Sequence, residues 1–159
     1  IFSSVEALRE AQKTDGTSLG IVKPKKVERV IIQPRDNKEV EQAIAKKDSI
    51  VKQLDLFETK KDLYILPVRI MIEFSCDDPQ CGGHKMSILD WEFGQLYRKA
   101  ARTKDWQAKI EAKIMDEIFG KTRDTYVILG NMAAHPQTFC ALGFFWPPKA
   151  GSRQMGLFT

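Results

Sequence analysis

The chain contains little cysteine and histidine, with 3 cysteines and 2 histidines among 159 residues. An odd number of cysteines in a chain of this size argues against a secreted disulfide scaffold and favours a reducing, cytoplasmic setting. No apolar run approaches the roughly 20 residues that cross a bilayer, so the sequence predicts no transmembrane helix and no membrane partner. No signal peptide is visible, but the chain starts at Ile1 rather than methionine, so we expect it to be the C-terminal part of a longer protein.

Two motifs of metal-dependent hydrolysis are also missing. The zinc-protease motif H-E-x-x-H does not occur, and Glu92 is followed by Phe93 and Gly94 rather than by the x-Lys of the D…E-x-K nuclease pattern. Composition is that of a globular chain, with 43% hydrophobic and 29% charged residues. The net charge of +4 permits contact with nucleic acid and does not require it.

The densest group of metal-ligating residues lies in one short stretch. Cys76, Cys81 and His84 form the pattern C-x4-C-x2-H. Zinc prefers thiolate and imidazole ligands, and a gap of four residues falls within the usual spacing of a chelating cysteine pair. Pro79 and the Gly82–Gly83 pair favour a tight turn that aims the three side chains at one point. The stretch therefore predicts a structural zinc loop.

A structural zinc site needs a fourth ligand. We favour His135, because it is the only other histidine and lies in the loop of an expected hairpin. The other candidates are Cys140, Asp77 and Asp78. Two alternatives to a metal site stay open: a reduced cysteine pair in a surface turn with a solvated His84, and a disulfide.

Hydrophobic periodicity predicts a mixture of helices and strands. Alternation from Leu63 to Ser75 predicts a strand that leads into the zinc loop. Helices are expected after the cap residues Ser3, Asp36, Ser87 and Asp105, and strands over 27–33, 125–129 and 139–146, the last two flanking a long loop. The fold class is therefore α+β, with a mixed or antiparallel sheet, packed helices and the metal loop as an insertion. Residues 1–148 are expected to form one domain and residues 149–159 a flexible tail, since Pro147 and Pro148 end the last strand.

An Asp-Trp-Glu sequence stands at the expected start of the helix after the zinc loop. Asp90 is explained first by capping, with Ser87 three residues before it. If the loop holds a metal, Glu92 could act as a general base on metal-bound water. With His84 and His135, these carboxylates define an alternative function, a metal-dependent nuclease or hydrolase with Asp90 and Glu92 as catalytic candidates. The competing interpretation is a packed tryptophan beside an exposed glutamate.

Two groups of basic residues are candidates for contact with nucleic acid. The first group is Lys23, Lys25, Lys26 and Arg29, and the second is Arg98, Lys99 and Arg102. The second group shares a helix end, where the dipole also favours cations. Binding through either group would be electrostatic and would weaken steeply with salt. The competing interpretation of the first group is a charged strand edge that discourages pairing with another chain.

Two short peptides indicate a protein partner. Residues 53–57, Gln-Leu-Asp-Leu-Phe, resemble the bacterial sliding-clamp-binding pentapeptide at every position. Residues 154–158 resemble it at Gln154, Leu157 and Phe158, with Met155 as a conservative second residue. Such a peptide inserts apolar anchors into a groove while the glutamine fixes its register. The second copy follows the expected tail, whereas the apolar residues of the first follow a helix and can equally belong to a core. The resemblance implies an association with replication or repair.

A broader resemblance covers most of the chain from Val5 to Pro148. The Cys-Cys-Gly-His loop, Asp-Trp-Glu, and the later Gly-Asn, His-Pro and Gly-Phe-Phe-Trp-Pro-Pro sequences together resemble an uncharacterised family of small bacterial or phage proteins. No activity comes with that family. The sequence therefore favours a DNA-associated binding module in replication, repair or phage defence, with a structural zinc loop and a clamp-docking tail.

Overall fold

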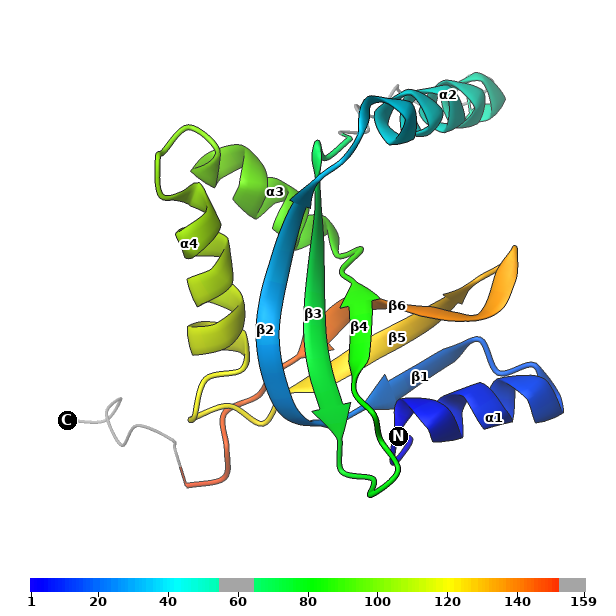
Figure 1. Ribbon diagram of the computed structural model, residues 1–159, viewed down its shortest axis with the longest axis vertical. Helices are drawn as coiled ribbons and strands as arrows, with labels where there is room; N and C mark the ends of the chain where they lie inside the picture. The colour runs from blue at the N-terminus through cyan, green and yellow to red at the C-terminus, as the bar shows by residue number, and fades with distance from the viewer. Residues whose placement is uncertain (55–64, 152–159) are drawn as a thin grey trace.

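The computed structural model describes residues 1–54 and 65–151 (Figure 1). The helices are α1 (Val5–Asp15), α2 (Asn37–Leu54), α3 (Trp91–Ala100) and α4 (Trp106–Ala112), which continues into the π-helix η1 (Lys113–Ile118). The strands are β1 (Leu19–Val22), β2 (Pro24–Pro34), β3 (Val68–Cys76), β4 (His84–Ser87), β5 (Tyr126–Met132) and β6 (His135–Phe145). They form two antiparallel three-stranded sheets, β1-β5-β6 and β2-β3-β4. The predicted α+β class is confirmed, and the metal loop is the connection between β3 and β4.

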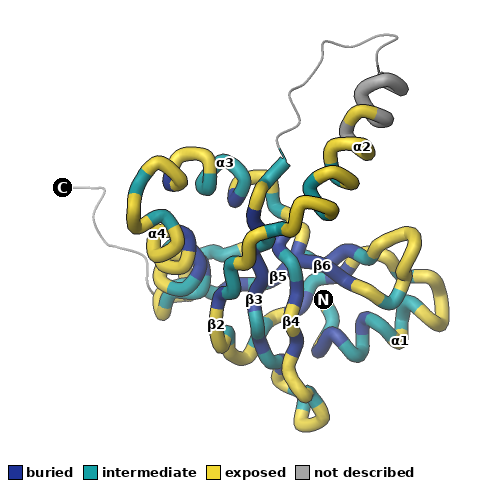
Figure 2. Tube along the Cα trace, turned by 45° about the horizontal axis from the view of Figure 1, so that its top comes forward, coloured by how far each residue is buried: buried dark blue, intermediate teal, exposed yellow. Residues whose placement is uncertain are grey.

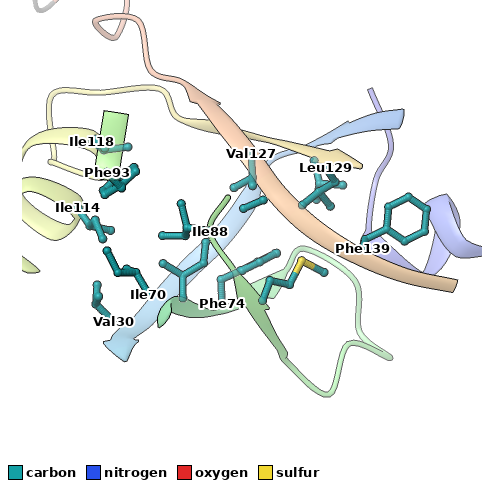
Figure 3. Packing of buried hydrophobic residues seen from close by; sticks show 14 of the residues in the cluster. Val30, Ile70, Phe74, Ile88, Phe93, Ile114, Ile118, Val127, Leu129 and Phe139 are labelled. Carbon is teal, nitrogen blue, oxygen red and sulfur yellow. The ribbon is translucent and has the colours of Figure 1, made fainter. Parts of the chain in front are cut away.

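One hydrophobic core is built from both sheets and the helices that cover them (Figure 3). Phe74 of β3 and Leu129 of β5 are at most 1% exposed. The segment after β4 joins the sheets through the backbone, because the Ile88 amide donates to the Ile70 carbonyl at 2.8 Å and the Leu89 amide donates to the Ala141 carbonyl at 2.7 Å. The two sheets are therefore joined by backbone hydrogen bonds as well as by a shared core.

Helix α1 is fixed to the β1-β5-β6 sheet by its first turns. The cap is Ser4, one residue later than the expected Ser3, and its hydroxyl accepts from the Ala7 amide at 3.1 Å. Val5 and Leu8 are fully buried. Leu8 packs directly over Gly20 of β1, where an added Cβ would lie 2.6 Å from the Leu8 Cδ1. This packing fixes the rotation of α1 about its axis, and with it the direction of the other side chains of its first turn.

The expected helix start after the zinc loop needs correction. Residues 84–87 form β4 against β3, so Ser87 pairs with Met71 and caps nothing. The cap of α3 is Asp90, whose carboxylate accepts from the Glu92 amide at 2.9 Å. The expected burial of the tryptophan is also wrong, since Trp91 is 74% exposed. Ile88 and Leu89 stay outside the helix because their amides donate to the Ile70 and Ala141 carbonyls.

Three further boundaries differ from expectation. The strand predicted from residue 63 begins at Val68 in the described residues. The prediction of a long hairpin loop over 130–136 is wrong, because β5 runs to Met132 and β6 begins at His135. The helix expected after Asp105 ends as a π-helix in which the Phe119 amide donates to the Ile114 carbonyl at 2.9 Å. Gly120 ends it, since a Cβ there would lie 2.2 Å from the Asp116 carbonyl oxygen.

Helix α2 stands away from the two sheets, and its described residues are largely exposed (Figure 2). Its first turn is held to β3 by an ion pair of 2.6 Å between Arg69 Nη2 and Glu39 Oε1. A search of the helices within residues 1–54 and 65–151 finds none long and apolar enough to cross a membrane.

The packing of α1 on β1 can be tested at Gly20. We expect Gly20→Ala to destabilise the fold by about 1–3 kcal/mol, because the added Cβ would lie 2.6 Å from Cδ1 of the fully buried Leu8. Gly143→Ala is the control, since its Cβ would meet only Asp90 Oδ2 at an ordinary 3.6 Å. Urea denaturation of the two variants measures the difference, and equal stability would contradict the tight contact.

Candidate metal centre

One group of potential metal ligands lies in the described residues, and it consists of Glu6, Cys76, Cys81 and His84. Their ligand atoms all lie within 4.8 Å of one another. Cys76 ends β3, Cys81 lies in the following loop, His84 begins β4, and Glu6 comes from the first turn of α1. Figure 1 shows the start of α1 beside this loop. The group can therefore hold a metal ion.

The loop between β3 and β4 folds back on itself so that the two cysteines meet. The Asp78 carboxylate accepts from the Gln80 amide at 2.9 Å, and the Cys81 amide donates to the Asp78 carbonyl at 3.0 Å. This turn places the Cys81 Sγ 3.2 Å from the Cys76 amide, which donates to it. Gly83 then takes φ +90, a left-handed conformation that favours glycine and lets the chain enter β4.

His84 is the most enclosed polar side chain of the group. Its side chain is 4% exposed, and its ring packs against Phe74 with 5.5 Å between ring centroids. The Nε2 atom lies 3.2 Å from the Cys81 Sγ and 3.2 Å from the Glu6 Oε1. One ring nitrogen therefore faces both a thiol and a carboxylate, the arrangement expected of a ligand atom directed at a shared ion.

Glu6 supplies the fourth donor from a distant part of the sequence. Its Oε2 atom is buried and has no hydrogen-bond partner within the described part of the chain. The Nε of Arg9, one helical turn later, is also buried without a partner there. Buried polar atoms normally find partners, so an unpaired carboxylate oxygen beside two thiols and an imidazole fits a position for a cation.

Burial determines the protonation of the group in the absence of metal. Burial raises the pKa of the Cys76 thiol to about 11, and the nearby Cys81 adds to the rise. Burial lowers the pKa of His84, although Glu6 acts in the opposite direction. Neutral imidazole is the form that binds metals, whereas a thiol must lose its proton first. Metal binding at this group would accordingly release protons.

The structure does not bring the other candidate ligands to this group. His135 is exposed at the start of β6, where it pairs with Met132. Cys140 is buried within β6 opposite Gly130. Asp77 is exposed and lies 3.3 Å from Lys25, and Asp78 is used in the loop turn. Sequence reasoning missed Glu6, whose only visible role was in a capping box.

The residues of the hydrolase hypothesis lie on separate elements. His84 belongs to the group above, while Asp90 caps α3 and Glu92 is exposed in its first turn. Among the described residues, neither carboxylate nor His135 shares a group of ligand atoms with His84. In the described part of the chain, Asp90, Glu92 and His135 therefore lie outside the candidate metal group.

The first basic group is largely paired with acids. Lys23 Nζ lies 2.5 Å from Asp124, and Lys26 Nζ lies 2.6 Å from Glu28. Arg29 donates from Nε and Nη2 to both carboxylate oxygens of Glu73 at 2.6 and 3.0 Å. The resulting charge-assisted hydrogen bonds lower the pKa of Glu73. In the second group, Arg98 and Lys99 lie in the last turn of α3 and Arg102 follows it, all three exposed.

The two pentapeptides fall almost entirely outside the described residues. Gln53 and Leu54 close α2, and residues 55–57 and 154–158 lie outside. The start of the expected tail is held, since the Lys149 amide donates to the Thr122 carbonyl at 2.8 Å.

Comparison with curated proteins and with solved structures gives no match. A family model does match, and it covers residues 2–159, almost the whole chain. The chain therefore belongs to the family described as a domain of unknown function, DUF8757.

Proposed function

We propose that this chain is a binding module whose fold is stabilised by one zinc ion held by Glu6, Cys76, Cys81 and His84. The convergence of the four ligand atoms within 4.8 Å carries the proposal. Two thiolates and an imidazole are ligands that zinc prefers over magnesium or calcium, and a carboxylate completes a tetrahedral set.

The donor set favours a structural role over a catalytic one. Catalytic zinc usually keeps one position for water, whereas four protein donors close the coordination sphere. The ion would connect α1 to the β3–β4 loop, two parts of the chain that are distant in sequence. Its binding free energy would then contribute directly to the stability of the fold.

The sequence of residues 154–158 supports a cellular context. We propose that the module works in DNA replication or repair and docks on a bacterial sliding clamp through Gln154, Met155, Leu157 and Phe158. The Lys149 backbone is held by a hydrogen bond, so the apolar residues that follow it in the sequence can bind a groove on a partner without disturbing the core.

The metal proposal predicts about one zinc per chain. Cys81→Ser should remove the zinc and lower the melting temperature by roughly 10 °C. At a free zinc concentration about 100-fold above the dissociation constant, bound zinc stabilises the fold by about 3 kcal/mol, and this stabilisation would be lost. Elemental analysis and thermal unfolding with and without chelator measure both effects. Cys140→Ser is the matched control, because this third thiol lies outside the group, and it should retain the metal. A wild-type chain that contains no zinc and melts unchanged with chelator would refute the proposal.

The identity of the fourth ligand gives a separate prediction. Glu6→Ala should weaken zinc binding by about 10-fold or more, because it opens the coordination sphere. Glu10→Ala, an exposed acid on the same helix, and His135→Ala should bind zinc like the wild type. Competition with a chromophoric chelator gives the affinities. Loss of zinc in His135→Ala with retention in Glu6→Ala would reverse the assignment.

Clamp docking predicts micromolar binding, roughly −8 kcal/mol, of the intact chain to a bacterial sliding clamp. Leu157→Ala/Phe158→Ala should weaken it by about 100-fold, because apolar anchors carry most of the energy of such peptides. Leu56→Ala/Phe57→Ala in the internal copy is the control and should bind normally. Calorimetric titration separates the cases: no binding by the intact chain, or a loss confined to the internal variant, would exclude the tail as the docking element.

A further inference from the structure

A second site is indicated by the distribution of charge. One pocket is lined by six cationic residues and one acidic residue, Asp124, so that its lining residues carry an excess of five positive charges. The whole chain has a net charge of only +4, so the remainder of the molecule is close to neutral. The cations are Lys23, Lys25, Lys26, Lys121, Arg123 and Lys149. We call this cavity the basic pocket.

The basic pocket lies where three parts of the chain meet: the start of β2, the turn after η1, and the segment after β6, at the lower left of Figure 1. Its walls are tied together by the backbone. The Asp124 amide donates to the Pro147 carbonyl at 2.8 Å, and the Lys149 amide donates to the Thr122 carbonyl at 2.8 Å. Val27, Met115 and Phe119 supply its apolar lining. These hydrogen bonds therefore fix the backbone that carries the cations.

Existing ion pairs do not neutralise the basic pocket strongly. Lys23 pairs with Asp124, Lys25 with Asp77 and Lys26 with Glu28, and these lysine side chains are 55 to 68% exposed. Exposed pairs contribute little free energy, so a ligand of higher charge can replace the carboxylates. The Arg123 Cζ atom lies 4.9 Å from the centroid of the Trp146 ring, a cation–π contact that helps to position its guanidinium.

We propose that the basic pocket binds an anion that carries at least two phosphate groups. Its volume of about 410 Å³ is within the range of small-ligand sites and accommodates a diphosphate or triphosphate group. Lysine and arginine are the side chains that recognise phosphate oxygens, and an excess of five charges exceeds what one phosphate would balance. The same chemistry is offered by a free polyphosphate and by consecutive phosphates of a nucleic-acid backbone. The site includes none of the four proposed zinc ligands and none of residues 154–158.

The test uses the intact chain as purified with two probes, sodium tripolyphosphate and a 12-nucleotide single-stranded DNA. We expect tripolyphosphate to bind at low salt. The logarithm of its association constant should fall linearly with the logarithm of the salt concentration. Lys25→Gln/Lys121→Gln should weaken it by about 10-fold. Lys99→Gln/Arg102→Gln removes the same charge from exposed positions at the end of α3, outside the pocket, and should bind like the wild type. Melting temperatures confirm that both double variants are folded.

The two probes distinguish the sources of the phosphate. Oligonucleotide binding that tripolyphosphate competes away assigns the pocket to a nucleic-acid backbone, and tripolyphosphate binding alone assigns it to a small phosphorylated ligand. Absence of binding by both probes at low salt overturns the proposal. Equal weakening by the two double variants also overturns it, because net charge rather than the pocket would then account for the binding.

Discussion

The contact between Glu6 and His84 is the interaction on which the candidate metal centre depends. It joins α1 to β4 and makes a three-residue motif into a four-donor group. The contact exists because Val5 and Leu8 are fully buried, which fixes the rotation of α1 about its own axis. In a helix, residue 6 then points to one side of the buried stripe, toward the β3–β4 loop. The packing of the apolar face of α1 thus also places Glu6 in the candidate metal group.

Local spacing was sufficient to predict that three of the four members of the group lie together. Cys76, Cys81 and His84 lie close enough in sequence that a turn alone can bring them together, and their spacing is a known property of zinc loops. Glu6 could not be found in this way, because its position depends on how Leu8 packs over Gly20. Tertiary contacts of this kind leave no local periodicity in the sequence.

The choice of His135 failed to match the geometry for a different reason. It rested on a long hairpin loop, which Gly130, Asn131 and Pro136 indicated by their turn preferences. Backbone pairing extends β5 and β6 through these residues, and the Asn131 side chain donates to the Pro136 carbonyl at 2.9 Å instead of shaping a loop. β4 was missed similarly, since four residues are too few to show a reliable alternation. The α+β class survived both errors because it depends on the longer elements, above all β3.

Glu6 also decides whether the centre is closed or open to solvent. The side chain of His84 is 4% exposed and that of Glu6 is 42% exposed, although the Glu6 Oε2 atom itself is buried. A pocket of about 480 Å³ is lined by two members of the group, Cys81 and His84, from the side of β3 and β4. A metal ion held by all four side chains would have a closed set of protein donors, whereas displacement of Glu6 would leave one position open, as in catalytic zinc sites. The packing of α1, which places Glu6, would then matter as much to the coordination of such an ion as the cysteine–histidine motif itself.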